Sequence, residues 1–339
     1  MKKAIITGVT GQDGSYLSEF LLKKNYEVHG LLRRTSFLNL DRIQAAINKY
    51  EKIGKFNLHY IDMTDTSSIS NLIIKIKPQE FYNLAAMSHV GISFYTGEAT
   101  LNINSLATYR ILESISKHHR KCKFYQASSS EMFGSTPPPQ NEKSPFNPQS
   151  PYGISKVSAF YTARYFRQAH NLFSANGILF NHESPRRGIN FVTRKITHTL
   201  ARILAGHEKK LYLGNIKIKR DWGHSKDYVV AIWKILQQKK PDDFVIATEI
   251  NHTVKEFVNE VFKKVGLNWK DFTVTGDKKF IRPAEVVNLK GDARKAKKIL
   301  KWKPKYNFYD ICEELLVSDL KLYGMTLSEA KIKAKKLKK

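Results

Sequence analysis

A short apolar strand runs directly into a turn of three evenly spaced glycines, and this feature constrains the fold more than any other. The strand Ala-Ile-Ile leads into the turn GVTGQDG, in which Gly8, Gly11 and Gly14 recur at every third position. Residues 15–24 then carry apolar side chains at helical spacing, and residues 26–32 form a second apolar strand. A strand–helix–strand unit of this kind predicts a parallel sheet with right-handed crossovers.

Strand and helix patterns continue to alternate up to residue 180. Four further strands are predicted, at 58–60, 80–84, 123–127 and 177–180. Helices are predicted at 67–75, at 106–117 and from Tyr152 onward, and a loop rich in Pro, Asn and Gln at 135–150. We therefore predict an α/β fold with a doubly wound Rossmann sheet in residues 1–180.

The alternation loosens in the second half of the chain. A helix is predicted at 192–205 and a short edge strand at 210–213. Thr253 and Glu256 have capping-box spacing, which predicts the start of another helix. We expect residues 181–339 to form mainly a smaller α/β substrate domain, with segments that return to the first domain.

Cysteine content and chain length limit the class of protein. A chain of 339 residues, 42% of them hydrophobic, buries a core that needs no disulfides. Cys122 and Cys312 are the only cysteines, and they form no CxxC pair, so we expect a cytoplasmic protein without a structural metal. The first apolar run stops at Thr7, which is too short for a membrane span or a signal sequence. No membrane partner is expected.

The formal net charge of +27 raises the alternative of nucleic-acid binding. The lysines are spread along the chain, however, and form a dense run only at 331–339. No RNA-binding motif and no zinc spacing accompanies them. We expect a solvated basic surface that attracts an anionic small molecule, and no specific nucleic-acid partner.

The glycine turn predicts a dinucleotide site, because it follows a strand and opens a helix. Glycines permit a tight turn and a close approach of the backbone, and a helix N-terminus favours the pyrophosphate. A purely structural turn is the alternative. The turn residues expected at the cofactor are Gly8, Thr10, Gly11, Gln12, Asp13 and Gly14.

The residue that follows the second strand indicates which dinucleotide binds. Arg33 and Arg34 stand where an NAD site has a carboxylate, and the next acidic residue is Asp41. A guanidinium binds phosphate in a bidentate manner, so we predict NADP. The residues expected beside the adenine are Asp62 and Met63, and those beneath the nicotinamide are Leu84, Ala85 and Ala86.

Tyr152 and Lys156 are four residues apart and would share one face of a helix. A neighbouring ammonium favours phenolate and lowers a tyrosine pKa, so this tyrosine is a candidate base for a hydroxyl that loses hydride from its carbon. The same spacing arises by chance in many chains. Glu131, which follows Ser129 and Ser130, adds a carboxylate that indicates chemistry beyond simple oxidation.

Taken together, these motifs and several others resemble the GDP-mannose 4,6-dehydratase family, extended short-chain dehydrogenase/reductases that act on nucleotide sugars. The resemblance extends from Lys3 to about Lys303 and is carried by TGVTGQDGSYL, HVGISF, ASSSEMFG, SPYGISK, FNHESPRRG, FVTRKIT, LYLGN, RDWGHSKDYV and IRPAEV. FNHESPRRG with RDWG is specific to this subfamily.

The resemblance implies an oxidation, an elimination and a reduction within one turnover. Tyr152 would take the proton of the sugar C4 hydroxyl while C4 hydride passes to NADP, and Lys156 would hold the phenolate. Glu131 would then remove the C5 proton, water would leave from C6, and hydride would return to C6. Ser129 would polarise the C4 ketone. The middle position of the run is Ser130, as in the GDP-mannose type, where dTDP-glucose enzymes have Asp.

The resemblance also implies binding residues and an assembly. His182 and Arg187 would lie near the cofactor. The residues expected at the sugar are Ser88 and Asn181, and those expected at the GDP portion are Lys195, Arg220, Arg282 and Glu285. Relatives are homo-oligomers, so we expect a dimer or tetramer in which the segment 35–42 reaches a neighbour.

A few positions depart from the family pattern. Ser129 replaces the commoner Thr, Met87 a Gln, Gly91 an Ala and Ala99 a Tyr. A related branch acts on GDP-D-glycero-D-manno-heptose, and room near Met87 and Gly91 would suit its longer side chain. A nucleotide-sugar epimerase or reductase, or a non-catalytic binding protein of the same fold, remains as the alternative function.

Overall fold

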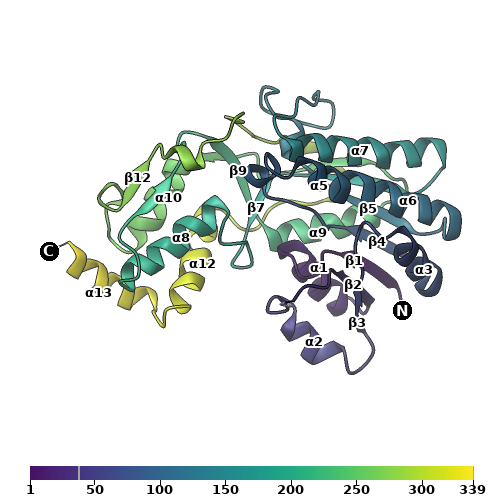
Figure 1. Ribbon diagram of the computed structural model, residues 1–339, viewed down its shortest axis with the longest axis horizontal. Coiled ribbons are helices and arrows are strands. Elements are labelled where there is room, and N and C mark those ends of the chain that lie inside the picture. Colours follow the sequence, from purple (N-terminus) through teal and green to yellow (C-terminus); the bar gives the residue numbers. More distant parts are fainter. Residues whose placement is uncertain (37–38, 339) are drawn as a thin grey trace.

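A seven-stranded parallel sheet forms the centre of the larger lobe in the computed structural model, which describes residues 1–36 and 39–338 (Figure 1). The strand order is β10-β6-β5-β4-β1-β2-β3, and all neighbours are parallel. The strands are β1 (Lys3–Thr7), β2 (Glu27–Leu32), β3 (Phe56–Tyr60), β4 (Glu80–Asn83), β5 (Lys123–Ser129), β6 (Ser174–Leu179) and β10 (Asp243–Ile246). The predicted α/β fold with a parallel sheet is confirmed.

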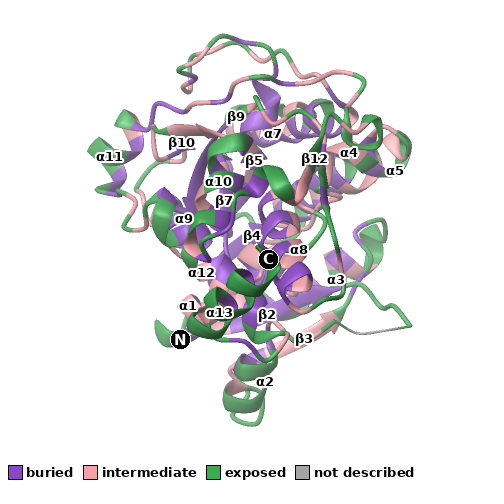
Figure 2. Ribbon diagram, turned by 90° about the vertical axis from the view of Figure 1, so that its left-hand side faces the viewer, coloured by how far each residue is buried: buried purple, intermediate pink, exposed green. Residues whose placement is uncertain are grey.

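Helices cover both faces of this sheet, because alternate strand residues point to opposite sides. Ala4 and Ile6 pack against one helical layer, whereas Ile5 between them packs against the other. The first layer consists of α1 (Gln12–Lys23), α2 (Gln44–Tyr50), α9 (Ser225–Leu236) and α11 (Arg294–Leu300). The second consists of α3 (Thr66–Ile76), α6 (Ala107–His118) and α7 (Pro151–Ala169). Figure 2 shows the buried residues concentrated between these layers.

Short helices lie near the carboxyl ends of the strands. They are α4 (Val90–Ser93), α5 (Gly97–Leu101), a π-helix at Asn102–Leu106 and a 3-10 turn at Ser130–Met132. The π-helix was not predicted, since nothing in its amino acid composition distinguishes it from the first turn of α6.

The second lobe has its own core and lies beside the carboxyl ends of the sheet (Figure 1). It contains β7 (Asn181–Glu183), α8 (Val192–Leu204), β8 (Leu211–Leu213), β9 (Lys219–His224), β11 (Asn251–Thr253), α10 (Val254–Lys264), β12 (Thr273–Thr275), α12 (Phe308–Lys321) and α13 (Leu327–Leu337), with 3-10 turns at Trp269–Asp271 and Lys278–Phe280. The predicted capping box at Thr253 is confirmed, because its side chain accepts from Glu256 N while Glu256 caps its backbone.

The chain passes between the lobes more than once. Residues that follow β7 build the second lobe, but α9, β10 and α11 come from the second half of the sequence and complete the large sheet. Among the residues that the structure describes, no helix is both long and apolar enough to cross a membrane.

Candidate active site

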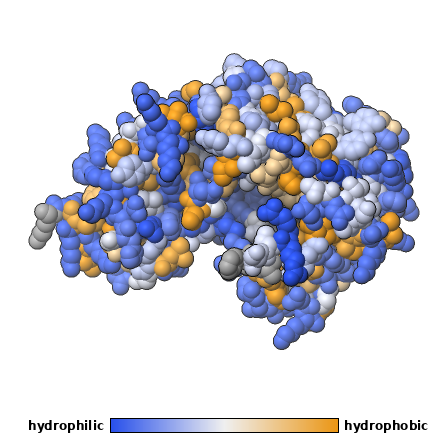
Figure 3. Space-filling view, in the orientation of Figure 1, coloured by the Kyte–Doolittle hydropathy of each residue, from blue (hydrophilic) through white to orange (hydrophobic). Residues whose placement is uncertain are grey.

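A deep cavity of about 1090 Å³ opens between the two lobes, at the carboxyl ends of the sheet strands (Figure 3). Strand order reverses on either side of β1, which lies between β4 and β2. A doubly wound sheet binds ligands at such a switch point. The cavity is therefore where the fold itself places a ligand site.

The glycine turn forms one wall of the cavity, and Gly8 and Gly14 have no room for a side chain. Gly8 has a φ of +67°, and a Cβ on Gly14 would lie 2.3 Å from the Gly8 carbonyl oxygen. The floor beside the turn is held by Thr7, whose Oγ1 accepts from Leu84 N and Ala85 N, both at 2.9 Å. A cradle in which a Cβ would collide with backbone fits a dinucleotide that approaches the chain closely.

Arg33 and Arg34 differ in position although they are adjacent. Arg33 lines the cavity, and its charge contributes, after hydrogen bonds from Thr64, to the lowered pKa of Asp62. Arg34 lies over the ring of Tyr60 at 5.9 Å from the ring centroid. Arg33 is therefore the guanidinium that faces a bound ligand.

Tyr152 and Lys156 lie on the first turns of α7, which begins sharply because Ser150 Oγ accepts from Gly153 N at 3.0 Å. Both side chains are buried and both line the cavity. Lys156 Nζ donates to the Ala127 carbonyl at 2.8 Å and lies 5.8 Å from the centroid of the Tyr152 ring. The predicted shared face is thus observed.

The expected lowering of the tyrosine pKa by this lysine is wrong for the protein alone. Burial raises the pKa of Tyr152 to about 12, although the hydrogen bond with Ser129 and the charge of Arg187 oppose the rise. Burial also lowers the pKa of Lys156 to about 8. Desolvation disfavours both charged forms and outweighs the effect of the neighbouring ammonium.

Ser129 is the last residue of β5, and the 3-10 turn that follows turns Glu131 toward Tyr152. Ser129 Oγ accepts from Glu131 N at 3.2 Å. Glu131 is buried, at 7% exposure, and the charge of its carboxylate raises the pKa of Tyr152. Hydroxyl, carboxylate and phenol therefore meet at one place in the cavity.

The opposite end of the cavity is lined by charged side chains of the second lobe. Arg220 Nη2 lies 3.8 Å from Glu131 Oε1 and 3.7 Å from Glu285 Oε1, and Arg282 Nη1 lies 3.6 Å from the same Glu285 oxygen. Within the described part of the chain, four buried cavity-lining atoms have no hydrogen-bond partner: Asn181 Oδ1, Arg187 Nε, Arg220 Nη2 and Glu285 Oε1. Unsatisfied buried donors and acceptors indicate a polar ligand.

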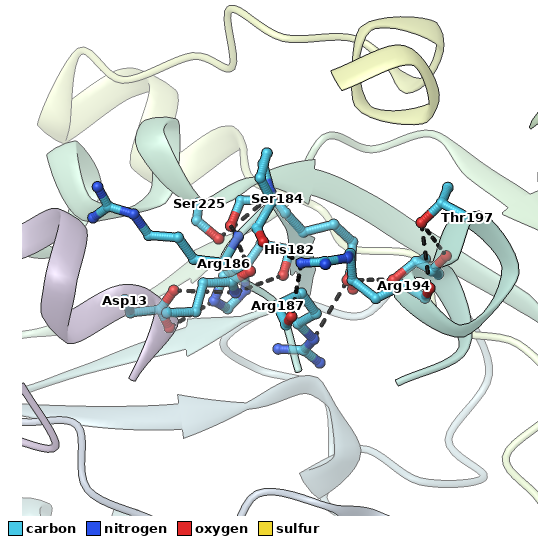
Figure 4. A network of polar contacts seen from close by, with 12 residues as sticks. Asp13, His182, Ser184, Arg186, Arg187, Arg194, Thr197 and Ser225 are labelled. Carbon is cyan, nitrogen blue, oxygen red and sulfur yellow. Dashed lines mark hydrogen bonds and ion pairs between the residues drawn. The ribbon is translucent and has the colours of Figure 1, made fainter. Parts of the chain in front are cut away.

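An ion pair beneath the glycine turn joins the two lobes (Figure 4). His182 Nε2 lies 2.8 Å from Asp13 Oδ2, and His182 Nδ1 donates to the Phe180 carbonyl at 2.7 Å. Burial opposes charge on this ring, but the Asp13 carboxylate raises the pKa of His182 above its usual range. The imidazolium thus satisfies both acceptors.

All of the predicted site residues line this one cavity, although their individual roles stay predictions. They are Gly8, Thr10, Gly11, Gln12, Asp13, Gly14, Arg33, Asp62, Met63, Leu84, Ala85, Ala86, Ser88, Ser129, Glu131, Tyr152, Lys156, Asn181, His182, Arg187, Lys195, Arg220, Arg282 and Glu285. Met87 and Gly91 also line it. Ala99 is not among the lining residues.

Sequence reasoning missed several residues that shape the cavity. The His89 ring lies 5.3 Å from that of Phe191, and Lys195 Nζ lies 3.0 Å from the centroid of the Phe280 ring. Asn104, in the π-helix, accepts from Met87 N at 2.9 Å and donates to the Ser155 hydroxyl at 3.0 Å. Of these residues, Asn104 could have been noticed in the sequence, because an asparagine within a helix is unusual. The ring contacts could not have been predicted, because they join segments that are distant in the sequence.

Comparison of the sequence with known proteins identifies the family to which the chain is similar. A family model described as GDP-mannose 4,6 dehydratase matches residues 5–315. GDP-mannose 4,6 dehydratase 1 of Arabidopsis thaliana is 54% identical over 327 residues, which cover 95% of this chain and 90% of the relative. The GDP-mannose 4,6 dehydratase of Homo sapiens is 47% identical over 340 residues, which cover 94% of this chain and 91% of the relative.

Solved structures of similar fold are more distant in sequence. The dTDP-glucose 4,6-dehydratase of Bacillus anthracis, solved with NAD, superimposes with a TM-score of 0.81 at 23% identity, covering 97% of this chain and all of that one. The UDP-glucose 4-epimerase of Thermotoga maritima gives 0.81 at 21% identity, covering 95% of this chain and 99% of that one. At such identities the likeness establishes the fold alone.

Proposed function

The chain belongs to the GDP-mannose 4,6-dehydratase family, and from this premise we propose that it removes water from GDP-mannose to form the 4-keto-6-deoxy sugar. The observation that carries the proposal is the meeting of Ser129, Glu131 and Tyr152 at the carboxyl end of the sheet. A 4-epimerase or a C4 reductase acts on C4 alone and needs no base for the C5 proton. Glu131 therefore favours dehydration over these alternatives.

The three side chains divide the proton transfers between them. Tyr152 accepts the proton of the C4 hydroxyl, and the Ser129 hydroxyl donates to the C4 oxygen. Glu131 removes the C5 proton once a ketone at C4 has made that proton acidic, and the C6 hydroxyl leaves with that proton as water. When hydride adds at C6, a proton returns to C5. A bound nicotinamide dinucleotide supplies the hydride acceptor for C4 and returns the hydride to C6.

We propose NADP as that dinucleotide. The support is Arg33, which lines the cavity beside Asp62, where a 2′-phosphate would be bound by a guanidinium. The glycine cradle fits either dinucleotide, so the choice between NAD and NADP depends on this one side chain.

We also propose that residues 1–180 hold the cofactor, that residues 181–339 hold mainly the GDP-sugar, and that the protein acts in the cytoplasm as a homo-oligomer. Apolar side chains exposed on the π-helix, α6 and α7 support an assembly: Leu106, Tyr109, Ile154, Tyr161 and Tyr165. The predicted contact through segment 35–42 includes residues 37–38, which lie outside the described residues.

The test is incubation with GDP-mannose and NADP⁺, followed by mass spectrometry of the sugar nucleotide. We expect a product lighter by one water, without net reduction of the cofactor. Tyr152→Phe is expected to lower kcat by roughly 10²- to 10⁴-fold, whereas Tyr309→Phe, at an exposed position of α12, keeps wild-type activity.

Glu131→Gln separates dehydration from the alternatives. We expect this variant to oxidise C4, to leave the cofactor reduced and to release no water. A wild-type protein that removes no water from GDP-mannose would contradict the proposed substrate. GDP-manno-heptose, offered in parallel, tests the related branch.

A further inference from the structure

Residues 184–191 connect β7 to α8, and the backbone of the first part of this loop, residues 184–188, is held by guanidinium groups. Arg194 Nη1, on the first turn of α8, donates to the carbonyl oxygens of Pro185 and Arg187, the latter at 3.1 Å. Arg194 is only 5% exposed. One side chain therefore binds two backbone carbonyls of a segment that belongs to no helix or strand.

The other edge of Arg194 is occupied by a carboxylate from the far side of the second lobe (Figure 4 shows Arg194 and Thr197). Asp319, in α12, accepts from Arg194 Nε at 3.0 Å and Nη2 at 2.5 Å, and from Thr197 Oγ1 at 2.6 Å. Asp319 is completely buried and is not among the cavity-lining residues. Asp319 is linked to the cavity wall through Arg194, which binds the carbonyl of the cavity-lining Arg187.

Stability alone is a weak reason for such a pair. Removing two charges from water costs several kcal/mol per ion, and apolar replacements of similar volume are often as stable. What a guanidinium–carboxylate pair supplies is a fixed direction for the remaining N–H groups, because the fork is planar and bidentate. Here those N–H groups point at the loop.

A second arginine holds the same loop from the larger lobe. Arg42 Nε donates to the Arg186 carbonyl at 2.8 Å, and its Nη1 donates to the Thr10 carbonyl at 3.2 Å. Three successive carbonyls, from Pro185 to Arg187, are thus bound by two guanidinium groups. The loop is tied to α12 on one side and to the glycine turn on the other.

The loop carries Arg187, which lines the cavity. Its guanidinium lies 3.8 Å from the centroid of the Phe191 ring, and its Nε lies 3.4 Å from Oε2 of the buried Glu183.

The positive charge of Arg187 opposes the effect of burial on the pKa of Tyr152. Glu131 and Asp13 raise that pKa, and the Lys156 ammonium lies 5.8 Å from the centroid of the Tyr152 ring. Arg187 is therefore a cation, in addition to Lys156, whose charge favours the phenolate form of Tyr152.

We propose that Asp319 and Arg194 form a positioning pair that fixes the loop carrying Arg187 at the wall of the cavity that Tyr152 also lines, so that a buried acid of α12 influences the first proton transfer. The inference rests on the proposed function for its catalytic consequence. Its structural half, the hold on the loop, is independent of the substrate.

The experiment compares Asp319→Asn with Asp243→Asn. Asp243, the first residue of β10, is a similarly buried carboxylate that does not line the cavity. It accepts hydrogen bonds from Arg164, Arg167 and Asn176. Trypsin reports on the loop, because Arg186 and Arg187 are cleavage sites within it. We expect Asp319→Asn to be cut there roughly 10-fold faster than the wild type, and Asp243→Asn to be cut no faster.

Catalysis is then measured across pH with GDP-mannose. We expect Asp319→Asn to lower kcat roughly 10- to 100-fold and to move the rise of activity to higher pH, because Tyr152 loses a cation that favours its ionised form. Arg187→Met should produce the same shift. The double variant should be no slower than Arg187→Met alone, since both changes remove one interaction.

Two milder variants keep the inference testable if Asp319→Asn fails to fold. Arg194→Lys keeps the charge but loses the fork, and Thr197→Val removes one hydrogen bond from Asp319; both should show the loop cleavage and the pH shift to smaller extents. Wild-type cleavage and pH profile in a folded variant would overturn the proposal. A wild-type enzyme inactive on GDP-mannose, with faster loop cleavage in Asp319→Asn, would instead refute the proposed substrate and leave the positioning pair supported.

Discussion

The two ends of the cavity differ in the groups that shape them: one end is shaped by backbone atoms and the other by charged side chains. At the end proposed for the dinucleotide the shape comes from backbone: a Cβ on Gly8 or Gly14 would lie within 3.0 Å of backbone atoms, and backbone amides of the floor are already bound to Thr7. At the sugar-nucleotide end the shape comes from buried charges, and Arg220 Nη2 and Glu285 Oε1 have no hydrogen-bond partner among the described residues.

This difference has an energetic meaning. A backbone cradle is complete before the ligand arrives, so binding there requires little rearrangement. Buried charges without full partners already bear a desolvation cost, which a diphosphate or a ribose hydroxyl would relieve on binding. We therefore expect changes at the dinucleotide end to disrupt the scaffold itself, and changes at the other end to disrupt recognition.

Gly14→Ala should have the largest effect. The added Cβ would lie 2.3 Å from the Gly8 carbonyl oxygen and 2.8 Å from Val9 Cα, both backbone atoms that cannot move without opening the turn. We expect cofactor affinity to fall by about 100-fold or more, with a lower melting temperature. Fluorescence titration with NADP⁺ and thermal unfolding measure both.

Gly97→Ala is the matched control for this change, because its nearest neighbours would be Pro151 side-chain atoms at 3.7 Å or more. It should bind cofactor like the wild type. An unaffected Gly14→Ala would show that the turn is not a rigid cradle, and the contrast between the two ends would fail.

Arg220→Met tests the charged end. The variant leaves Glu131 and Glu285 without their shared cation and leaves the Val286 carbonyl without its donor at 2.8 Å. Removal of one partner of a buried charge pair costs about 2–5 kcal/mol, so we expect kcat/KM for GDP-mannose to fall by roughly 100-fold. Arg282→Met, at a more exposed member of the group, should fall about 10-fold.

Cofactor binding should be unchanged in both arginine variants if the two ends are independent. Isothermal titration with NADP⁺ decides this. Equal losses in cofactor and sugar binding would mean that the ends are coupled through the sheet.

Arg33→Ala is expected to have a smaller effect, confined to the phosphate of the cofactor. Loss of a charge-assisted contact should weaken NADP⁺ binding roughly 10-fold and leave NAD⁺ binding unchanged. Arg34→Ala is the neighbouring control, since Arg34 lies over Tyr60. If Arg34→Ala weakens NADP⁺ binding and Arg33→Ala does not, the assignment of the two arginines is reversed.

The same contrast explains what could be predicted from sequence. The turn from Gly8 to Gly14 and the pair Tyr152 and Lys156 were predictable, because local spacing dictates both backbone shape and the shared face of a helix. The strands of the first 180 residues and the longer helices α1, α3, α6 and α7 were predictable for the same reason, whereas α2, α4, α5 and the π-helix were not predicted.

Features that depend on burial or on distant partners were not predictable. Desolvation within the folded cavity raises the pKa of Tyr152. The expectation that the nearby Lys156 would lower this pKa was therefore wrong. Arg194 meets Asp319 across 125 positions of sequence, and no spacing rule connects them. Their contact arises only when α8 packs against α12.

Lys156→Met should produce the smallest change in free energy among these variants. The variant should lose activity, but its free energy of unfolding should increase. Burial lowers the pKa of Lys156 to about 8 from 10.5, so holding its charge in the folded protein costs up to about 3 kcal/mol below pH 8. Methionine removes that cost but deprives the Ala127 carbonyl of its donor at 2.8 Å. We expect the inactive variant to be about 1 kcal/mol more stable than the wild type at pH 7.

The pH dependence distinguishes this explanation from better packing. Between pH 8 and 10.5 the unfolded chain still binds the lysine proton that the folded protein has lost. Wild-type stability therefore rises through this window relative to the variant, and the advantage of Lys156→Met disappears above it. Urea unfolding of both proteins at pH 7 and pH 10 measures the difference, with Lys117→Met, at an exposed position of α6, as the control. An advantage that persists at pH 10 would mean that methionine packs better, and that the buried charge is not a cost carried for catalysis.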